Sequence, residues 1–569
     1  MIRPPISESH TDQRNPAGLT AAELAAVSAV SLLASIVLLA YLIDLAGWTI
    51  RPFAILPLSV AAGGLAFAWS NRGARWNAGE VATFAGIVAA VLAWLLWLAW
   101  PDLLPVGKGP DLAHHLVLID YIERHWRLVH EAPVGLGEMA HYTPGSQLLA
   151  ALAGAWAGSN GFHAVHSVVA FSVALKAGLV FLVVLRLLPR EVPRIPFGIA
   201  GALLLLAPHA YFVGSFTRDS FFAQVVSEMF AVGMWWALAV WEERPRTGAM
   251  ALFAFFGSAA FLTWPLWTGP LVLALLALVL ARDELKPGQR LGHLFLGAGP
   301  IAAVAAVYTA GRVGLVGMVG VSGAVIRPSQ VEFAWWFLLL SVVGLGLTVV
   351  WRHRRASVLL VAAIGAQAAV LFGLAKASGA DTPYMALKMV YLVLYPLAAG
   401  AALALAAGWQ LAVRASGSGT AGAWLRGRAG ELLAWVLVLL LGGAVVHPLV
   451  AAPRPTPVVS QPLYLAGQWA RAHVQRACVD YLVADGDTGY WLHLAVLGNP
   501  RAGPRMEQAD AFDPHEAVVR WITPGGLPFA IADLRILPRD IRGNVDVIAR
   551  FGPAVVIRRR GATSCPDGQ

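Results

Sequence analysis

Long apolar stretches follow one another over the first 450 residues of this chain, and they constrain its fold more than any other feature. A helix needs about 18 apolar residues to cross a bilayer, and several stretches exceed that length. They are continuous and lack the alternation of a membrane barrel. We therefore expect an α-helical polytopic membrane protein with about thirteen transmembrane helices. We place the spans near residues 24–46, 52–70, 80–100, 163–187, 197–213, 222–241, 248–264, 266–281, 291–309, 332–350, 356–376, 386–412 and 431–450.

Basic residues gather in every second loop between these spans. The richer loops carry, for example, Arg186, Arg190 and Arg194; Arg244 and Arg246; Arg282, Lys286 and Arg290; Arg414 and Arg428. The positive-inside rule then predicts a cytoplasmic N-terminal tail over residues 1–22, with the first span retained as a signal anchor, and a C-terminus outside the cytoplasm. Loop charge of this kind also accounts for the net charge of +9, so we expect no nucleic-acid partner.

The composition changes after Val450. "AAPRPTP" is a Pro-rich linker, and the following residues predict strands at "ACVDYLV", "LPFAIADL" and "AVVIRR" and a helix at "FDPHEAVVRWI" with Asp513 as its N-cap. We expect a transmembrane domain over residues 23–451 and a small extracytoplasmic α/β domain over residues 452–569. Both cysteines, Cys478 and Cys565, lie in this small domain, where an oxidising compartment allows a disulfide; two unpaired thiols are the alternative.

The outer loop over residues 101–145 holds an unusual cluster of ionisable groups. In "GPDLAHHLVLIDYIERH", Asp111, His114 and His115 have the spacing i, i+3, i+4, which places both imidazoles near the carboxylate if the segment is helical. Such a group can take a proton from a hydroxyl or hold a divalent metal. The alternative is a solvated helix at the membrane surface. The segment 145–158 is too short to span and predicts a re-entrant or interfacial helix.

Further polar residues in outer loops are candidates for substrate binding. Lys388 lies within the first turns of a span, where it either snorkels to headgroups or binds a lipid phosphate. The complete set of these candidates is Glu138, His141, Tyr142, Arg218, Gln224, Asp381, Tyr384 and Lys388.

The loop "PDLAHHLVLIDYIERHW…EMAHYTPGSQLLAAL" resembles the acidic first outer loop of the GT-C superfamily of membrane glycosyltransferases. This resemblance implies many spans, an extracytoplasmic C-terminal domain and a polyprenyl-phosphate-linked sugar donor. It also implies that Asp111 is the catalytic carboxylate and that Lys388 meets the carrier phosphate. We expect His114 and His115 to orient Asp111, bind a phosphate oxygen or ligate a metal. The chain departs from the family pattern because Leu-Ala-His-His follows Asp111 instead of a second acidic residue. A divalent metal, Mg²⁺ or Mn²⁺, is therefore left open.

The function expected from these features is a glycosyltransferase, for a hexose or a pentose, in the cytoplasmic membrane. It would move the sugar to a glycan, lipid or protein acceptor at the outer face, with inversion and with Asp111 as the base. The alternatives are a polysaccharide or lipid transporter and an O-antigen-type ligase. A transporter places ionisable residues at the membrane midplane, whereas the spans here are nearly free of charge.

Overall fold

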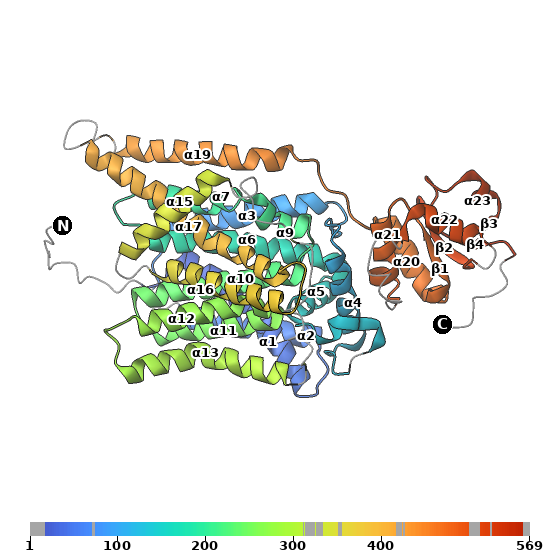
Figure 1. Ribbon diagram of the computed structural model, residues 1–569, viewed down its shortest axis with the longest axis horizontal. Helices are drawn as coiled ribbons and strands as arrows, with labels where there is room; N and C mark the ends of the chain where they lie inside the picture. Colours follow the sequence, from blue (N-terminus) through green and yellow to red (C-terminus); the bar gives the residue numbers. More distant parts are fainter. Residues whose placement is uncertain are drawn as a thin grey trace.

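A computed structural model gives the architecture of the chain (Figure 1). It describes residues 18–70, 74–131, 133–310, 312, 325, 334–350, 355–416, 424, 427–499, 512–523 and 526–561. Within these ranges, helices run side by side in one bundle, and a small domain of helices and strands lies at one end of it. The protein is thus a polytopic, mostly helical membrane protein with a C-terminal sheet, as predicted. Most of the predicted N-terminal tail, residues 1–17, lies outside the described residues.

Eight helices in the described part of the chain are long and apolar enough to cross a membrane. They are α1 (Ala21–Leu45), α3 (Ala78–Ala99), α6 (Gly161–Leu187), α10 (Phe222–Glu243), α13 (Pro287–Thr309), α16 (Ala356–Ala377), α17 (Tyr384–Ala415) and α19 (Arg428–Ala451). Further apolar helices are α2 (Pro52–Ser70), α7 (Arg194–Leu204), α11 (Thr247–Thr263), α12 (Thr268–Leu280) and α15 (Trp335–Val350). The number of thirteen crossings stays a prediction.

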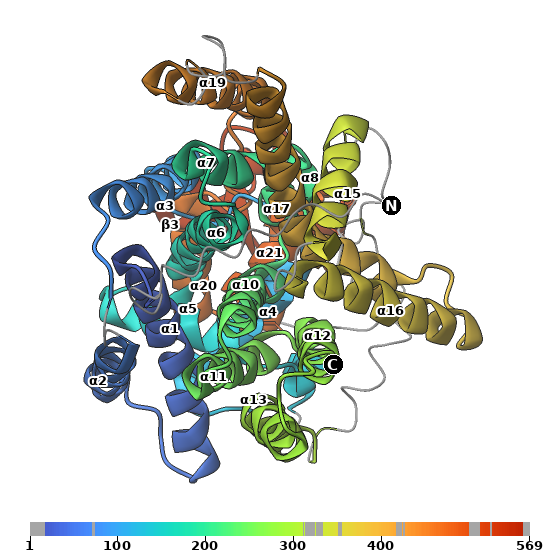
Figure 2. The same cartoon turned by 90° about the vertical axis from the view of Figure 1, so that its left-hand side faces the viewer.

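The helices α6 and α10 form the centre of the bundle, and the other helices surround them (Figure 2). Both central helices are buried along almost their whole length, whereas most residues of α3, α13 and α19 are partly or fully exposed. Apolar side chains that face outward suit a hydrocarbon environment, because lipid tails are as apolar as they are. The arrangement therefore separates a protein-packed interior from helices with a lipid-compatible outer surface.

The predicted helix over residues 197–213 is wrong in its second half. The helix α7 ends at Leu204, and two short helices follow, α8 (His209–Phe212) and α9 (Gly214–Thr217). Pro208 explains the break, because the residue before a proline is disfavoured in the helical conformation and the proline supplies no N–H. The chain turns here and brings Ser220 to the start of α4, where its Oγ accepts a hydrogen bond from the N–H of Gly109.

The predicted short helix at residues 145–158 is present as α5 (Gly145–Trp156). It packs against α4 (Pro110–His125) and α6, and most of its residues are buried. It is therefore part of the protein interior at the end of the bundle. Close packing at its start depends on Gly145, where a Cβ would lie 2.4 Å from Oγ1 of Thr263.

The C-terminal domain is a four-stranded sheet with helices. Strand β1 (Val479–Leu482) pairs in parallel with β2 (Phe529–Asp533), and β4 (Ala554–Arg559) pairs antiparallel with both β2 and β3 (Val545–Phe551), giving the order β1-β2-β4-β3. The three predicted strands are present, while β3 was missed. The helices are α20 (Gln461–His473), α21 (Gly486–Trp491), a π-helical turn η5 (Leu492–Val496), α22 (Pro514–Ile522) and α23 (Arg539–Gly543).

Two local predictions concern this domain. Asp513 caps α22 as predicted, because its carboxylate accepts hydrogen bonds from the backbone N–H groups of His515 and Glu516. Cys478 is fully buried and disulfide-bonded. Its predicted partner, Cys565, lies outside the described residues, so their pairing stays a prediction.

Candidate active site

The helix α4 carries the acidic cluster of the outer loop. Pro110 stands at its first position, which suits a residue with a fixed φ and no N–H, and Asp111 lies in its first turn, where the helix dipole favours a negative charge. The buried residues of α4 include Leu112, Leu116 and Ile119, which face the bundle. The rest of the helix is more polar, so α4 is amphipathic, as predicted, and lies across the end of the bundle (Figure 1).

A second loop touches the start of α4. The backbone N–H of Gly109 donates to Oγ of Ser220 at 3.0 Å, and a Cβ at Gly109 would lie only 2.2 Å from the carbonyl oxygen of Asp219. Only glycine allows this approach. It brings Asp219 to the same end of the bundle as Asp111, and burial raises the pKa of Asp219. The sequence places Asp219 in an outer loop but carries no signal for this contact.

Lys388 lies in the second turn of α17 and is only 2% exposed, so it does not snorkel to headgroups. Its ammonium nitrogen sits 4.0 Å from the ring centre of Phe221, 4.4 Å from that of Tyr384 and 5.0 Å from that of Trp264. Within the described ranges, no carboxylate lies within 4 Å of it. Rings of this kind attract a cation through their negative faces and leave it free to meet an anion.

Three carboxylates act on this ammonium at longer range, those of Asp111, Asp219 and Glu228. The hydroxyl of Tyr391, one turn further along α17, donates to Asp219 at 3.3 Å. The tertiary structure thus joins two acidic side chains and one lysine from three separate segments.

The two neighbouring histidines have different surroundings. His115 is buried; the amide of Gln147 lies 2.7 Å from its Nδ1, and the ring of Tyr142 packs edge-on with centres 4.9 Å apart. Burial lowers the pKa of His115 to about 4, against the opposing effect of Asp111, so its imidazole is neutral near pH 7. His114 instead has its Nε2 2.7 Å from the hydroxyl of Tyr490 in the C-terminal domain.

The second polar cluster of the loop lies on a 3₁₀ helix, η1 (Val134–His141). Glu138 is exposed, and its charge acts on both Tyr142 and Tyr384. Burial raises the pKa of Tyr142 well above its usual value, so its phenol is a hydrogen-bond donor at neutral pH. His141 is half-buried at the end of η1. Glu138 and Asp111 thus act on the same two tyrosines, Tyr142 and Tyr384.

Three other predicted residues have different surroundings. Arg218 is exposed and its Nε lies 3.1 Å from Oδ1 of Asp219. Asp381 is exposed in the turn before α17. Gln224 is buried in α10, where its amide nitrogen donates to Oε1 of Glu228 at 3.3 Å, so its side chain meets a carboxylate in the bundle.

A buried ion pair in the bundle was missed by the sequence analysis. Nζ of Lys176, in the middle of α6, lies 2.6 Å from Oε2 of Glu228 on α10, and the hydroxyl of Tyr395 donates to the same oxygen at 2.6 Å. Both charged side chains are at most 1% exposed. The expectation that the spans are nearly free of charge is therefore wrong here. Lys176 inside an apolar stretch was the available signal.

No protein-family model and no curated protein matches the sequence. Among solved structures, the arabinofuranosyltransferase AftD from Mycobacteria is similar with a TM-score of 0.51 and 14% identity, over 84% of this chain and 41% of that chain. The chain has the GT-C fold. The fold class predicted from the outer loop is thus confirmed.

Two other solved structures are similar with lower scores. ArnT from Cupriavidus metallidurans, bound to undecaprenyl phosphate, has a TM-score of 0.45 and 15% identity, over 86% of this chain and 99% of that chain. The oligosaccharyltransferase AglB from Archaeoglobus fulgidus, with an inhibitory peptide and a dolichol-phosphate, has a TM-score of 0.46 and 12% identity, over 80% and 69% of the two chains.

The C-terminal domain is docked on the loop over residues 101–145. Both oxygens of Asp120 on α4 accept from the guanidinium of Arg471 at 2.8 Å, and Oη of Tyr464 lies 2.5 Å from the amide nitrogen of Asn160. A cavity of about 330 Å³ lies between these groups, next to Glu123. Burial raises the pKa of Glu123 to about 7. No feature of the sequence predicts these contacts, which join residues hundreds of positions apart.

The described residues contain no group of three or more His, Cys, Asp or Glu side chains that could hold a metal ion. Asp111 and Asp219 are two carboxylates outside the spans whose charges act on Lys388. Carboxylate oxygens are the ligands that Mg²⁺ and Mn²⁺ prefer. A metal site here would therefore need further ligands from substrate or water.

Proposed function

We propose that the protein is a membrane glycosyltransferase that takes a sugar from a polyprenyl-phosphate carrier and transfers it to a hydroxyl of a glycan, lipid or protein. The observation that carries this proposal is Lys388, a buried ammonium held by three aromatic rings, with no carboxylate within 4 Å in the described ranges. A charge in this state gains most from an anionic ligand. The GT-C fold and the activity named for AftD support the same class of reaction.

In this proposal Lys388 binds the phosphate of the carrier. The bond between the anomeric carbon and the phosphate oxygen breaks, and the electron pair stays on that oxygen. An ammonium placed beforehand stabilises the developing charge without reorganisation. The exposed guanidinium of Arg218, which is ion-paired with Asp219, is proposed to assist at the rim of the site.

Asp111 is the proposed base. The acceptor hydroxyl attacks the anomeric carbon from the face opposite the phosphate, and its proton passes to the Asp111 carboxylate. A single displacement inverts the anomeric configuration. Asp219 then orients the acceptor. If a chelator abolishes activity, Asp219 and Asp111 would instead supply oxygen ligands for Mg²⁺ or Mn²⁺. Neutral His115 supports the start of α5 through Gln147 and fixes the wall behind Asp111.

The proposed location of this reaction is the outer face of the cytoplasmic membrane, with the N-terminus inside. Arginine-rich loops lie at the bundle end opposite the C-terminal domain, which is the end that the positive-inside rule assigns to the cytoplasm. Labelling of single engineered cysteines at Gly248 and Gly379 with an impermeant reagent tests this. Labelling of Gly379→Cys alone in intact cells supports the orientation, and labelling of Gly248→Cys alone reverses it.

The test of the function combines lipid binding with sugar transfer. Native mass spectrometry of purified protein should show bound polyprenyl phosphate, and Lys388→Met should lose it, while Lys376→Met, an exposed lysine near Phe372, should keep it. Asp111→Asn should retain the lipid and lose transfer of sugar from a polyprenyl-phosphate donor. Asp102→Asn, an exposed carboxylate in the same loop, is its control.

A transporter is the second candidate, because the Lys176–Glu228 pair lies inside the bundle, where transport proteins place their charges. The two functions differ in their products. Flipping of a fluorescent polyprenyl-linked sugar across proteoliposomes, with no sugar transfer by the wild type, would support transport and contradict the transferase. Release of a new glycoside, with the donor configuration inverted, supports the transferase.

A further inference from the structure

A cavity of about 530 Å³ opens at the end of α10 and the start of α11. The outer site lies at the other end of α10, and 22 residues of helix separate the two ends by about 30 Å. The cavity is therefore distinct from the Lys388 site and from the C-terminal domain. The arginine-rich loop over residues 244–246, which the positive-inside rule assigns to the cytoplasm, forms part of its wall.

The charges in this wall are unequal. Arg186 is neutralised, because it forms ion pairs with both Glu23 and Glu243, the latter at 2.6 Å. Arg244 and Arg246 are exposed, and neither has an ion-pair partner in the part of the chain that the structure describes. Three guanidinium groups and two carboxylates therefore stand at this cavity with a net charge of +1, and Arg244 and Arg246 are the arginines that no described carboxylate pairs with.

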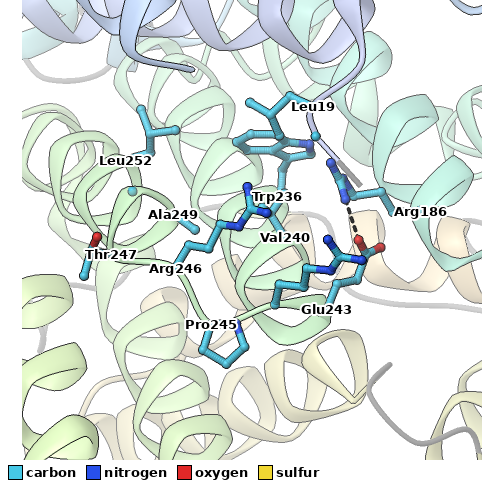
Figure 3. Close-up of a pocket in the computed structure, with 13 residues that line it drawn as sticks. Leu19, Arg186, Trp236, Val240, Glu243, Pro245, Arg246, Thr247, Ala249 and Leu252 are labelled. Carbon is cyan, nitrogen blue, oxygen red and sulfur yellow. Dashed lines mark hydrogen bonds and ion pairs between the residues drawn. The ribbon is translucent and has the colours of Figure 1, made fainter. Parts of the chain in front are cut away.

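The remaining wall is apolar. Leu19, Val240 and Leu252 line it together with the indole of Trp236. The indole N–H donates to Oε1 of Glu23 at 3.1 Å, which fixes the ring. Figure 3 shows Arg246 and Arg186 on either side of Trp236, with the apolar side chains around them.

We propose that this cavity binds an anionic phospholipid of the leaflet at that end of the bundle. Arg244 and Arg246 contact the phosphate oxygens, for which guanidinium is well suited because it donates in a planar fork. The part of an acyl chain next to the headgroup lies against Trp236 and Leu252. Basic pockets between helices at the cytoplasmic surface are where anionic headgroups bind. A free phosphate ion offers the same oxygens, but it would leave the apolar wall uncovered.

The experiment uses full-length protein in nanodiscs that contain phosphatidylglycerol and phosphatidylcholine in equal amounts. Native mass spectrometry after release should show retained phosphatidylglycerol in preference to phosphatidylcholine. The double variant Arg244→Gln/Arg246→Gln should weaken retention by roughly thirtyfold. Arg414→Gln/Arg428→Gln removes two exposed arginines from another loop of the same side and should leave retention unchanged.

Three results would overturn the proposal. Equal retention of phosphatidylglycerol by the wild type and the Arg244/Arg246 variant excludes these residues. An equal loss of phosphatidylglycerol retention in the Arg414/Arg428 variant would show that net charge, and not this cavity, determines retention. Full displacement of the lipid by inorganic phosphate, with phosphate bound in its place, identifies a free-anion site. Lys388→Met should not alter this retention, so failure of the outer-site proposal and failure of this one are distinguishable.

Discussion

Replacement of two buried lysines should affect stability differently, and this difference tests the proposal that Lys388 is held for a ligand. Lys176 and Lys388 are 0% and 2% exposed. Lys176 has a carboxylate at 2.6 Å, whereas Lys388 has aromatic rings around it and no carboxylate within 4 Å in the described ranges. Replacement of each by Met keeps most of the apolar stem and removes the charge. Only the first replacement leaves a carboxylate without its counter-charge.

The magnitudes follow from this difference. Breaking a buried pair by removing one partner costs about 3–5 kcal/mol. Glu228 would keep only the hydroxyl of Tyr395 and the amide of Gln224. At about 2 °C per kcal/mol for a large domain, Lys176→Met should lower the Tm by roughly 6–10 °C. Lys388→Met should change the free energy of unfolding by less than about 1 kcal/mol, because no close ion pair is broken.

Thermal unfolding in one detergent, followed by tryptophan fluorescence, measures both variants, since Trp235 and Trp236 lie buried on α10. In the same preparations Lys388→Met should bind polyprenyl phosphate about 10–150 times more weakly, the value of one charge-assisted hydrogen bond. A fall in Tm for Lys388→Met as large as for Lys176→Met would refute the reasoning. It would mean that Lys388 has a structural partner and is not held for a ligand.

Three further outcomes follow from the described contacts. Gly344→Ala should lower the Tm, because its Cβ would lie 1.7 Å from the carbonyl oxygen of Gly400 where α15 meets α17, whereas Gly346→Ala, with open space, should not. Gly109→Ala should reduce sugar transfer, because the added Cβ separates α4 from the loop that carries Asp219. The kcat of the variant is measured after circular dichroism has shown that it folds like the wild type. An unchanged kcat would contradict a role for this contact. The pKa of Glu123 is raised from 4.5 to about 7 in the folded protein, so the folded state binds its proton more tightly. Stability should therefore fall as the pH rises from about 4.5 to 7, and Glu123→Gln should remove that part of the pH dependence of the Tm; an identical slope in both proteins would count against it.

The sequence determined the class of protein because the length and continuity of its apolar stretches leave few alternatives. A stretch such as residues 163–187 has to form a helix in lipid, since its backbone groups find no other partners there, and α6 spans Gly161–Leu187. The C-terminal strands were also visible from local composition. Breaks caused by tertiary context were less visible: α7 stops at Leu204, although the apolar run continues to residue 213.

The sequence by itself also pointed to Asp111 and Lys388, because a charge next to or inside an apolar span is costly and stands out. Only the tertiary structure brought Asp219 to them, through the close approach that Gly109 permits. It alone paired Lys176 with Glu228. It alone gave the neighbouring histidines different surroundings, because His114 contacts Tyr490 whereas His115 is buried. The physical reason is that burial and hydration cost are local properties of a segment. Which partners meet depends on how distant segments pack, and no spacing along the chain encodes that directly.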